Sequence, residues 1–176
     1  MKIGVLAVQG AFIEHEHIIE KIGHEVVEIR QRKDLDGIDG IILPGGESTV
    51  QGQLLRKLDM LATIKSLIAD GLPTLATCAG LILLAGHIDN DDSVHIGTLP
   101  VTVKRNAYGR QLGSFVRTAP MKGFDEFPMI FIRAPYISSI KDNVDVLAAV
   151  NDRIVAVQYN NPVSYTHLTL PTKRIV

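Results

Sequence analysis

The sequence has little of several features that would assign it to a specialised class of protein. It contains one cysteine in 176 residues, so no disulfide can form within the chain, and this fits a reducing cytoplasm. Its 18 basic and 19 acidic residues leave a net charge of −1, without a basic block of the kind that binds nucleic acid. No apolar run approaches the roughly 18 residues of a membrane span. These absences favour a globular protein that binds neither nucleic acid nor a membrane.

The first residues also lack a targeting signal. Residues 1–8 have no basic segment followed by a long apolar stretch and a cleavage site, and they are typical of a first strand instead. Hydrophobic residues make up 46% of the 176 residues, which is enough for one domain with a full core. The sequence shows no internal repeat and no low-complexity linker.

Strands and helices alternate in the first half of the chain. Apolar runs predict strands at residues 3–8, 25–29, 40–43 and just before Cys78, and helical spacing of apolar residues predicts helices at 12–22 and 49–69. This order predicts an α/β fold, a three-layer sandwich built on a mainly parallel sheet.

The second half changes character and reads as a series of strands. Strand-like runs lie at residues 99–103, 114–117, 129–132, 144–150 and 153–158. Asn151-Asp152, between the last two runs, is a hairpin turn signal. We therefore expect an antiparallel extension of the parallel sheet, and the pattern gives no reason to divide these runs from the first half as a separate domain.

Cys78 lies between two apolar runs, in Leu75-Ala76-Thr77-Cys78-Ala79-Gly80. That pattern predicts a strand, a sharp turn and a helix, an elbow that holds a nucleophile clear of the backbone. The positive end of the helix dipole favours thiolate over thiol, and the backbone N–H of the next residue becomes free to hold an oxyanion. The alternative is that Cys78 is a small buried core residue, because free cysteine is among the most buried residue types.

A second loop strengthens the nucleophile interpretation. Pro44-Gly45-Gly46-Glu47-Ser48 follows one predicted strand, as Cys78 follows another. The carboxyl ends of parallel strands lie at one edge of the sheet, where open α/β sheets bind their ligands. Glu47 and Ser48 could equally be ordinary residues at a helix start, with Ser48 as the N-cap.

Five blocks of the sequence, in order, carry a family resemblance. They are residues 4–11, 43–49 and 77–81, then Arg105-Asn106 with Gly109-Arg110-Gln111, and finally 131–135. Together they resemble class I glutamine amidotransferases, and more narrowly the glutaminase subunits of pyridoxal 5′-phosphate synthases. The resemblance runs from residue 1 to about residue 158.

The resemblance implies an activity and a set of site residues. Such an enzyme hydrolyses L-glutamine to glutamate and ammonia through a glutamyl thioester on Cys78, with Gly46 and Ala79 supplying the oxyanion hole. The implied glutamine-binding residues are Gly46, Glu47, Ser48, Arg105, Ile132 and Arg133. An arginine suits the α-carboxylate because its planar fork can bond both oxygens. Without the resemblance, Arg105 reads as a solvated turn residue and Arg133 as a surface charge at a strand end.

The resemblance also implies a partner and a cellular setting. Ammonia would pass to a (β/α)₈-barrel synthase subunit inside a large hetero-oligomer, in the cytoplasm, for vitamin B6 biosynthesis. No metal and no other cofactor is implied. Two alternatives remain at this stage. One is another hydrolase of this fold, either a cysteine peptidase-like enzyme or the glutaminase of another pathway, and the other is a catalytically inactive partner-binding subunit.

The C-terminal segment departs from the family. The family completes its catalytic triad with His-Pro-Glu after the last strand, and this sequence contains no His-Pro-Glu. We therefore interpret residues 1–161 as an amidotransferase domain that is incomplete at its C-terminus. Residues 162–176 resemble a translated sequencing-adapter read rather than the family. His167 aligns within about a residue of the family's histidine, an agreement that chance explains. Because a cysteine nucleophile needs a base, we expect little glutaminase activity from the chain as written.

Other charged clusters give weaker signals. Glu14-His15-Glu16-His17 lacks the spacing of a helical metal site, which predicts a solvated helix face. His24, His87 and His95 stand alone in or near loops and are expected at the surface. Asp89-Asn90-Asp91-Asp92 resembles the start of a calcium loop without its later glycine and glutamate, which predicts a polar turn.

Overall fold

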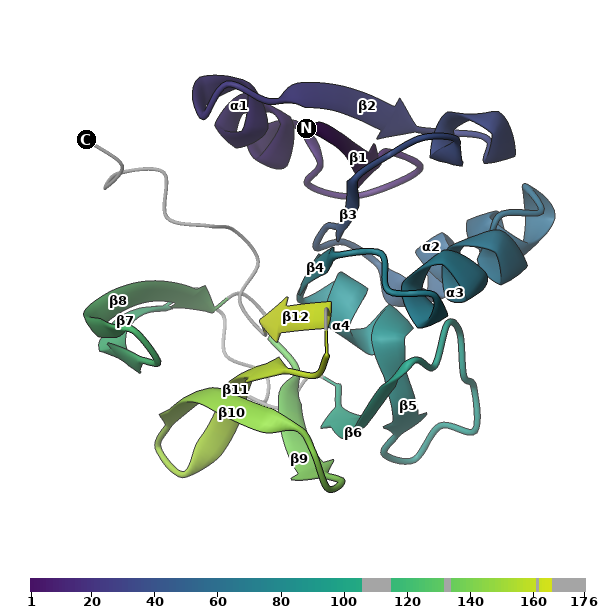
Figure 1. Cartoon of the computed structure of the whole chain (residues 1–176). Coiled ribbons are helices and arrows are strands. Elements are labelled where there is room, and N and C mark those ends of the chain that lie inside the picture. The colour runs from purple at the N-terminus through teal and green to yellow at the C-terminus, as the bar shows by residue number, and fades with distance from the viewer. Residues whose placement is uncertain (106–114, 132–133, 161, 166–176) are drawn as a thin grey trace.

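The computed structural model describes residues 1–105, 115–131, 134–160 and 162–165 (Figure 1). Its helices are α1 (Ile13–Lys21), the 3₁₀ helix η1 (Arg32–Leu35), α2 (Ser48–Lys57), α3 (Leu61–Ala69) and α4 (Ala79–Leu84). Strands of the first half are β1 (Lys2–Leu6), β2 (Glu25–Ile29), β3 (Gly40–Leu43), β4 (Thr74–Thr77) and β5 (Ala85–Ile88). Those of the second half are β6 (Leu99–Lys104), β7 (Phe115–Met121), β8 (Phe124–Phe131), β9 (Tyr136–Ile140), β10 (Asp145–Val150), β11 (Arg153–Gln158) and β12 (Pro162–Tyr165).

A ten-stranded sheet organises the described residues, in the order β2-β1-β3-β4-β12-β11-β9-β6-β5, with β10 paired to β11. Strands β1 to β4 and β12 are mutually parallel. Beyond β12 the pairs β12–β11, β11–β9 and β9–β6 are antiparallel. The predicted α/β fold, with a mainly parallel sheet and an antiparallel extension, is therefore confirmed.

Helices cover both faces of the parallel half of the sheet. Helix α1 packs its Ile19 with Val5 and Ile42 on one face. The opposite face carries Leu6 and Leu43, which join the larger core with α2, α3 and α4. Neighbouring strand residues thus point to opposite layers, as the period of a strand requires, and produce the predicted three-layer sandwich.

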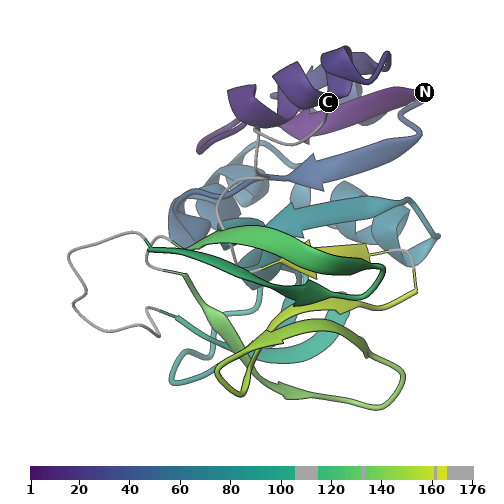
Figure 2. The ribbon, with the colours of Figure 1, turned by 90° about the vertical axis from the view of Figure 1, so that its left-hand side faces the viewer.

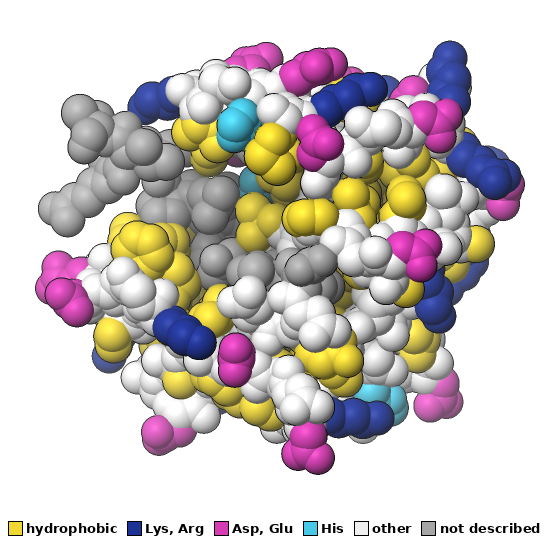
Figure 3. Space-filling view, in the orientation of Figure 1, with side chains coloured by type: hydrophobic (Ala, Val, Ile, Leu, Met, Phe, Trp, Pro, Cys, Tyr) yellow, Lys and Arg dark blue, Asp and Glu magenta, His cyan; other side chains and the backbone are white. Residues whose placement is uncertain are grey.

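A separate ribbon, β7–β8, covers part of the antiparallel half. Its Met129 and Phe131 form a second core with Val150 and Val155 of the β10–β11 hairpin. Figure 2 shows this ribbon lying across those strands. Outer residues of the ribbon remain exposed, Val116 among them, and apolar surface gathers over β7 and β8 in Figure 3. Acidic and basic side chains are interspersed over the rest of that view, in keeping with the near-zero net charge.

The helix predicted over residues 49–69 is in fact two helices, and the prediction of one continuous helix was wrong. Asp59, between α2 and α3, has φ +54°, a left-handed conformation that a continuing helix excludes and that aspartate tolerates better than most residues. The backbone N–H groups of Leu58 and Met60 still bond back to the end of α2, and this closes its last turn. The apolar stripe continues across the break, which is why periodicity alone did not reveal it.

Three strands were not predicted, and one of them, β12, lies at the centre of the sheet. It inserts between β4 and β11, with Tyr165 in register with Thr77, the residue before Cys78. Residues 162–165 therefore belong to the sheet, although sequence analysis set them in the non-family segment. The boundary at residue 161 and the origin of residues 162–176 stay predictions, and His167 lies outside the described residues.

Candidate active site

Cys78 occupies a strained elbow between β4 and α4. Its backbone has φ +48° and ψ −101°, in the half of conformational space that side-chain-bearing residues rarely adopt. The residue is 7% exposed, so the thiol lies in an almost closed site. A strained cysteine at a strand-to-helix turn confirms the predicted elbow and gives Cys78 a geometry that an ordinary core residue does not need.

Close backbone packing brings this elbow against the end of β3. A Cβ atom on Gly80 would lie 2.1 Å from the carbonyl oxygen of Leu43, so only glycine allows the approach. Because the Gly-Gly loop begins directly after Leu43, the first turn of α4 lies beside that loop. The two motifs that sequence analysis assigned to one edge of the sheet are therefore adjacent.

The loop that follows β1 holds the Gly-Gly loop in place. The backbone N–H of Ala11 donates to the carbonyl of Gly45 at 2.9 Å, and the N–H of Glu47 donates to Oε1 of Gln9 at 2.9 Å. A Cβ on Gly46 would lie 2.5 Å from that same Oε1. Gly46 is thus a position of close contact, and Gln9 is its neighbour.

Gln51 joins the loop after β1 to the start of the Gly-Gly loop. It is fully buried on α2, and its Nε2 donates to the carbonyl of Gln9 at 2.9 Å and to that of Pro44 at 3.3 Å. Sequence analysis did not select Gln9 or Gln51. A signal for Gln9 was available, because Gln9-Gly10 directly follows the first strand and so reaches the same edge of the sheet as Cys78.

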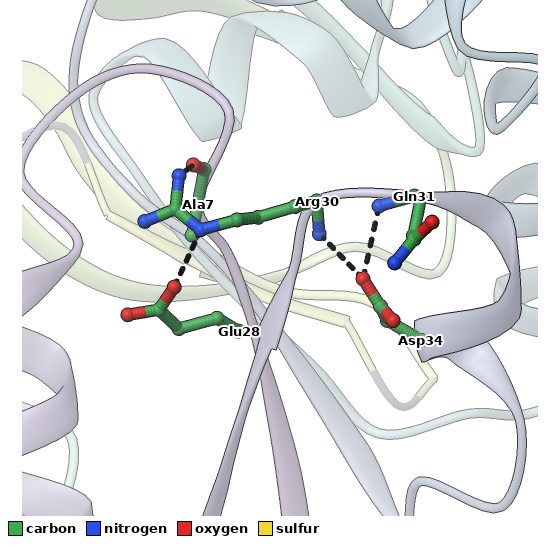
Figure 4. Close-up of polar contacts among 5 residues, drawn as sticks. All are labelled: Ala7, Glu28, Arg30, Gln31 and Asp34. Carbon is green, nitrogen blue, oxygen red and sulfur yellow. Dashed lines mark hydrogen bonds and ion pairs between the residues drawn. The ribbon is translucent and has the colours of Figure 1, made fainter.

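Figure 4 shows how the start of the β1 loop is fastened to β2. Arg30, just after β2, donates from Nη1 to the carbonyl of Ala7 at 2.8 Å and pairs with Glu28. Asp34 accepts the backbone N–H groups of Arg30 and Gln31, both at 3.0 Å. The loop that supports Gly46 and Glu47 is consequently anchored at its beginning as well as at its tip.

The electrostatics of Cys78 differ from the expectation based on the helix dipole. The pKa of the thiol is raised to about 11, mainly by burial; the negative charge of Glu47 also raises it, and a hydrogen bond from the Ala79 backbone lowers it. Burial outweighs the N-terminus of a helix only six residues long. The favourable effect of the helix dipole is therefore not enough to ionise Cys78, and at neutral pH the sulfur needs a base to take its proton, as the sequence analysis expects.

Ser48 and Glu47 take definite places at the start of α2. Ser48 is the first helical residue and is buried, while Glu47 is the N-cap and its side chain makes no capping hydrogen bond. The alternative of Ser48 as N-cap was therefore wrong. Two predicted glutamine-binding residues, Ile132 and Arg133, lie outside the described residues.

Arg105 lies in a cluster of its own, directly after β6. Its Nη1 pairs with Oδ2 of Asp91 at 2.9 Å, and its side chain is 27% exposed, so it is not a freely solvated turn residue. Its Nε and Nη2 are buried and have no hydrogen-bond acceptor among the described residues. No hydrogen bond or ion pair in that part of the chain joins Arg105 to Cys78.

Two histidines were predicted wrongly. His15, at 2% exposure, and His95, at 7% exposure, are both buried rather than at the surface. Burial lowers the pKa of each imidazole, and for His95 the guanidinium groups of Arg56 and Arg105 lower it further.

Among the residues that the structure covers, no group of three or more His, Cys, Asp or Glu side chains could hold a metal ion. The helices of the same residues include none with the length and apolar character needed to cross a membrane.

Comparisons with known proteins agree closely with one another. The family model described as "SNO glutamine amidotransferase family" matches residues 5–170. A relative from Desulfitobacterium hafniense, named pyridoxal 5′-phosphate synthase subunit PdxT, is 56% identical over 164 residues, which cover 93% of this chain and 82% of the relative. Its namesake from Haemophilus influenzae is 53% identical over 92% of this chain and 86% of its own. A solved structure described as a glutamine amidotransferase superposes with a TM-score of 0.89 at 36% identity, covering 94% of this chain and 88% of its own.

Proposed function

Because the chain belongs to the SNO glutamine amidotransferase family, we propose that it is the glutaminase subunit of a pyridoxal 5′-phosphate synthase. It hydrolyses L-glutamine to glutamate and supplies the ammonia to a synthase subunit. The observation that carries this function is the strained Cys78 elbow packed beside the Gly-Gly loop, since that arrangement places a nucleophile next to the backbone N–H groups proposed for the oxyanion hole.

Cys78 is the nucleophile in this scheme. After loss of its proton, the sulfur adds to the carboxamide carbon of glutamine, and the carbonyl oxygen takes the negative charge. The nitrogen then leaves with an added proton as ammonia, and a thioester remains. Water attacks the thioester carbon, the carbon–sulfur bond breaks, and glutamate and the free thiol are released. The backbone N–H groups of Gly46 and Ala79 are proposed to hold the oxyanion in both halves of the reaction.

Substrate binding is proposed for the residues that the family resemblance indicates. Gly46, Glu47 and Ser48 line the loop next to Cys78, and Ile132 and Arg133 are expected to join them. Arg105 is proposed to bind the α-carboxylate. Support for this role comes from its two unoccupied donor nitrogens, which suit a pair of carboxylate oxygens.

The proton of Cys78 requires an acceptor, and the raised pKa makes this requirement strict. The sequence has no His-Pro-Glu. We propose that the chain as written is therefore a weak glutaminase, in which His167 does not replace the family's histidine. The partner is proposed to be a (β/α)₈-barrel synthase subunit in a hetero-oligomer, and the compartment is proposed to be the cytoplasm, where a lone cysteine stays reduced.

One experiment tests the function and its alternatives together. Glutamate release is measured with the D. hafniense synthase subunit present, for this chain, for a chimera that carries the D. hafniense relative's segment in place of residues 162–176, and for Cys78→Ser in both. We expect release from the chimera, little from the chain as written, and none from either Cys78→Ser variant. Equal glutamate release from the chain as written and from the chimera would overturn the proposal that the chain as written lacks the catalytic base.

Two further readouts separate the alternatives. If both the chain as written and the chimera bind the synthase subunit but neither releases glutamate, the protein is a catalytically inactive subunit. Cleavage of a peptide in preference to glutamine would identify a peptidase-like hydrolase, and release that no synthase subunit stimulates would point to the glutaminase of another pathway.

A further inference from the structure

Asp91 is held rigidly in the turn that follows β5. Its backbone N–H donates to the carbonyl of Ile88 at 3.2 Å, and Asn90 before it adopts φ +59°. Its Oδ1 accepts the backbone N–H of Ser93 at 2.9 Å. Hydrogen bonds from the Ser93 side chain and backbone keep the pKa of Asp91 below its usual value, so its carboxylate is ionised at neutral pH. The other oxygen, Oδ2, is the one that meets Arg105.

That contact uses only one corner of the guanidinium. Arginine carries five N–H donors and no acceptor, and here Asp91 takes Nη1. Nε and one N–H of Nη2 lie along another edge of the same plane, and both nitrogens lack an acceptor among the described residues. Because this edge presents two parallel donors, it matches the two oxygens of a carboxylate.

The surroundings leave positive charge that Asp91 does not balance. Arg56 approaches His95 with Nη1 at 3.3 Å from Nδ1, and since arginine cannot accept, Nδ1 is the acceptor and His95 is neutral. Nη1 also donates to the carbonyl of Gly52 and Nη2 to that of Val94. The cluster thus holds two guanidinium groups beside a neutral imidazole, and the Asp91 carboxylate pairs with one of them, Arg105. An anionic group that reached Arg105 would be attracted to it and would satisfy donors whose hydration is already lost.

We propose that Asp91 is a positioning residue for glutamine binding, which fixes Arg105 through Nη1 and so presents Nε and Nη2 to the α-carboxylate of the substrate. This inference rests on the proposed function, because it assumes that Arg105 binds glutamine. It adds a residue that makes no contact with the substrate itself. Its removal is expected to weaken binding and to leave the chemical step unchanged.

The test uses Cys78→Ala as background, so that glutamine is bound without being consumed, in complex with the synthase subunit. Calorimetry measures the dissociation constant for L-glutamine and for 4-aminobutanamide, which lacks the α-carboxylate. Asp91→Asn is expected to weaken glutamine binding about tenfold, the effect of losing one charge-assisted contact, and to leave 4-aminobutanamide binding unchanged. Asp91→Glu is expected to recover most of the loss.

Three controls make the outcome decisive. Asp92→Asn removes the same charge from the exposed neighbouring residue and is expected to have no effect. Ser93→Ala loosens Asp91 without changing any charge, and should weaken glutamine binding two- to threefold even if Asp91→Asn folds poorly. In the active chimera, Asp91→Asn should raise KM without lowering kcat.

The failure of each proposal gives a different result. If Arg105→Ala leaves glutamine affinity intact, the proposed role of Arg105 is wrong, and the positioning role of Asp91 is wrong with it. If Arg105→Ala weakens binding but Asp91→Asn and Ser93→Ala do not, only the positioning role is overturned. Equal weakening of both ligands by Asp91→Asn would also overturn it, because the effect would then not pass through the carboxylate.

Discussion

The pH dependence of Cys78 alkylation tests the electrostatics of the elbow directly. The thiol is shifted from its ordinary pKa of 9.0 to about 11, chiefly by burial. Raising the pKa from 9.0 to about 11 lowers the thiolate fraction at neutral pH about a hundredfold, from roughly 1% to roughly 0.01%. Because only the thiolate reacts with iodoacetamide, the folded protein should react about a hundredfold more slowly than the same chain in denaturant, apart from any effect of restricted access.

The assay is the alkylation rate between pH 6 and pH 10.5, followed by mass spectrometry on the single cysteine. In the folded protein the rate is expected to rise about tenfold per pH unit, without a plateau below about pH 10. In denaturant it should level off near pH 9. The shape of the profile separates the pKa from access, because restricted access lowers the rate equally at every pH.

Glu47→Gln is the matched variant. The Glu47 carboxylate raises the pKa of Cys78 less than burial does, so its loss should move the profile to lower pH by a smaller step and should leave the protein folded. A folded protein whose rate levelled off below pH 8 would refute the reasoning, since the helix N-terminus would then outweigh burial. The same shift predicts a stability contribution that is fully present below the unfolded pKa of about 9 and is lost as the pH rises through about 11.

Three further predictions concern packing and protonation. Gly80→Ala should destabilise the protein by about 1–3 kcal/mol in chemical unfolding, because its Cβ would meet the Leu43 carbonyl oxygen at 2.1 Å, and an unchanged midpoint would contradict that close approach. Gly52→Ala should also be destabilising, although alanine normally favours a helix by about 1 kcal/mol, because its Cβ would lie 2.1 Å from Nδ1 of His95. In a His95→Ala background the same change should become stabilising, and a double-mutant cycle that found no coupling would exclude the clash. His15 has a lowered pKa through burial, so its contribution to stability is present above about pH 6.5 and is lost as the pH falls below that value. Replacement by Gln should flatten the stability profile between pH 7 and pH 5, and an unchanged slope would assign the acid sensitivity to other groups.

Local signals predicted those parts of the fold whose cause is local. Asn151-Asp152 predicted a hairpin, and both residues adopt positive φ values, of 51° and 60°, as a tight turn of this kind requires. Cys78 was predicted at an elbow from the apolar runs on either side of it. In both cases the conformation depends on neighbours in the sequence, so the sequence contains the reason.

Features that depend on distant partners were not predictable in this way. His95 is buried because Gly52, on α2, leaves room for its ring. The residues near His95 in the sequence give no indication of this contact. Gln51 and Gln9 meet across 42 positions of the chain. Asp91 was predicted to lie in a polar turn, as it does, but its contact with Arg105 follows from the parallel pairing of β5 and β6. The resemblance, rather than any local pattern, selected Arg105.

The central place of β12 makes the order of synthesis matter for folding. Strands β1 to β4 can pair as soon as they have been made, but the sheet between β4 and β11 stays open until residues 162–165 have left the ribosome. Until then the edge of β4 next to the nucleophile exposes unpaired backbone groups, the kind of edge at which chains aggregate. A nascent chain therefore depends on chaperone protection, or on rapid completion of the sheet, more than one whose central strands are all made before its outer ones.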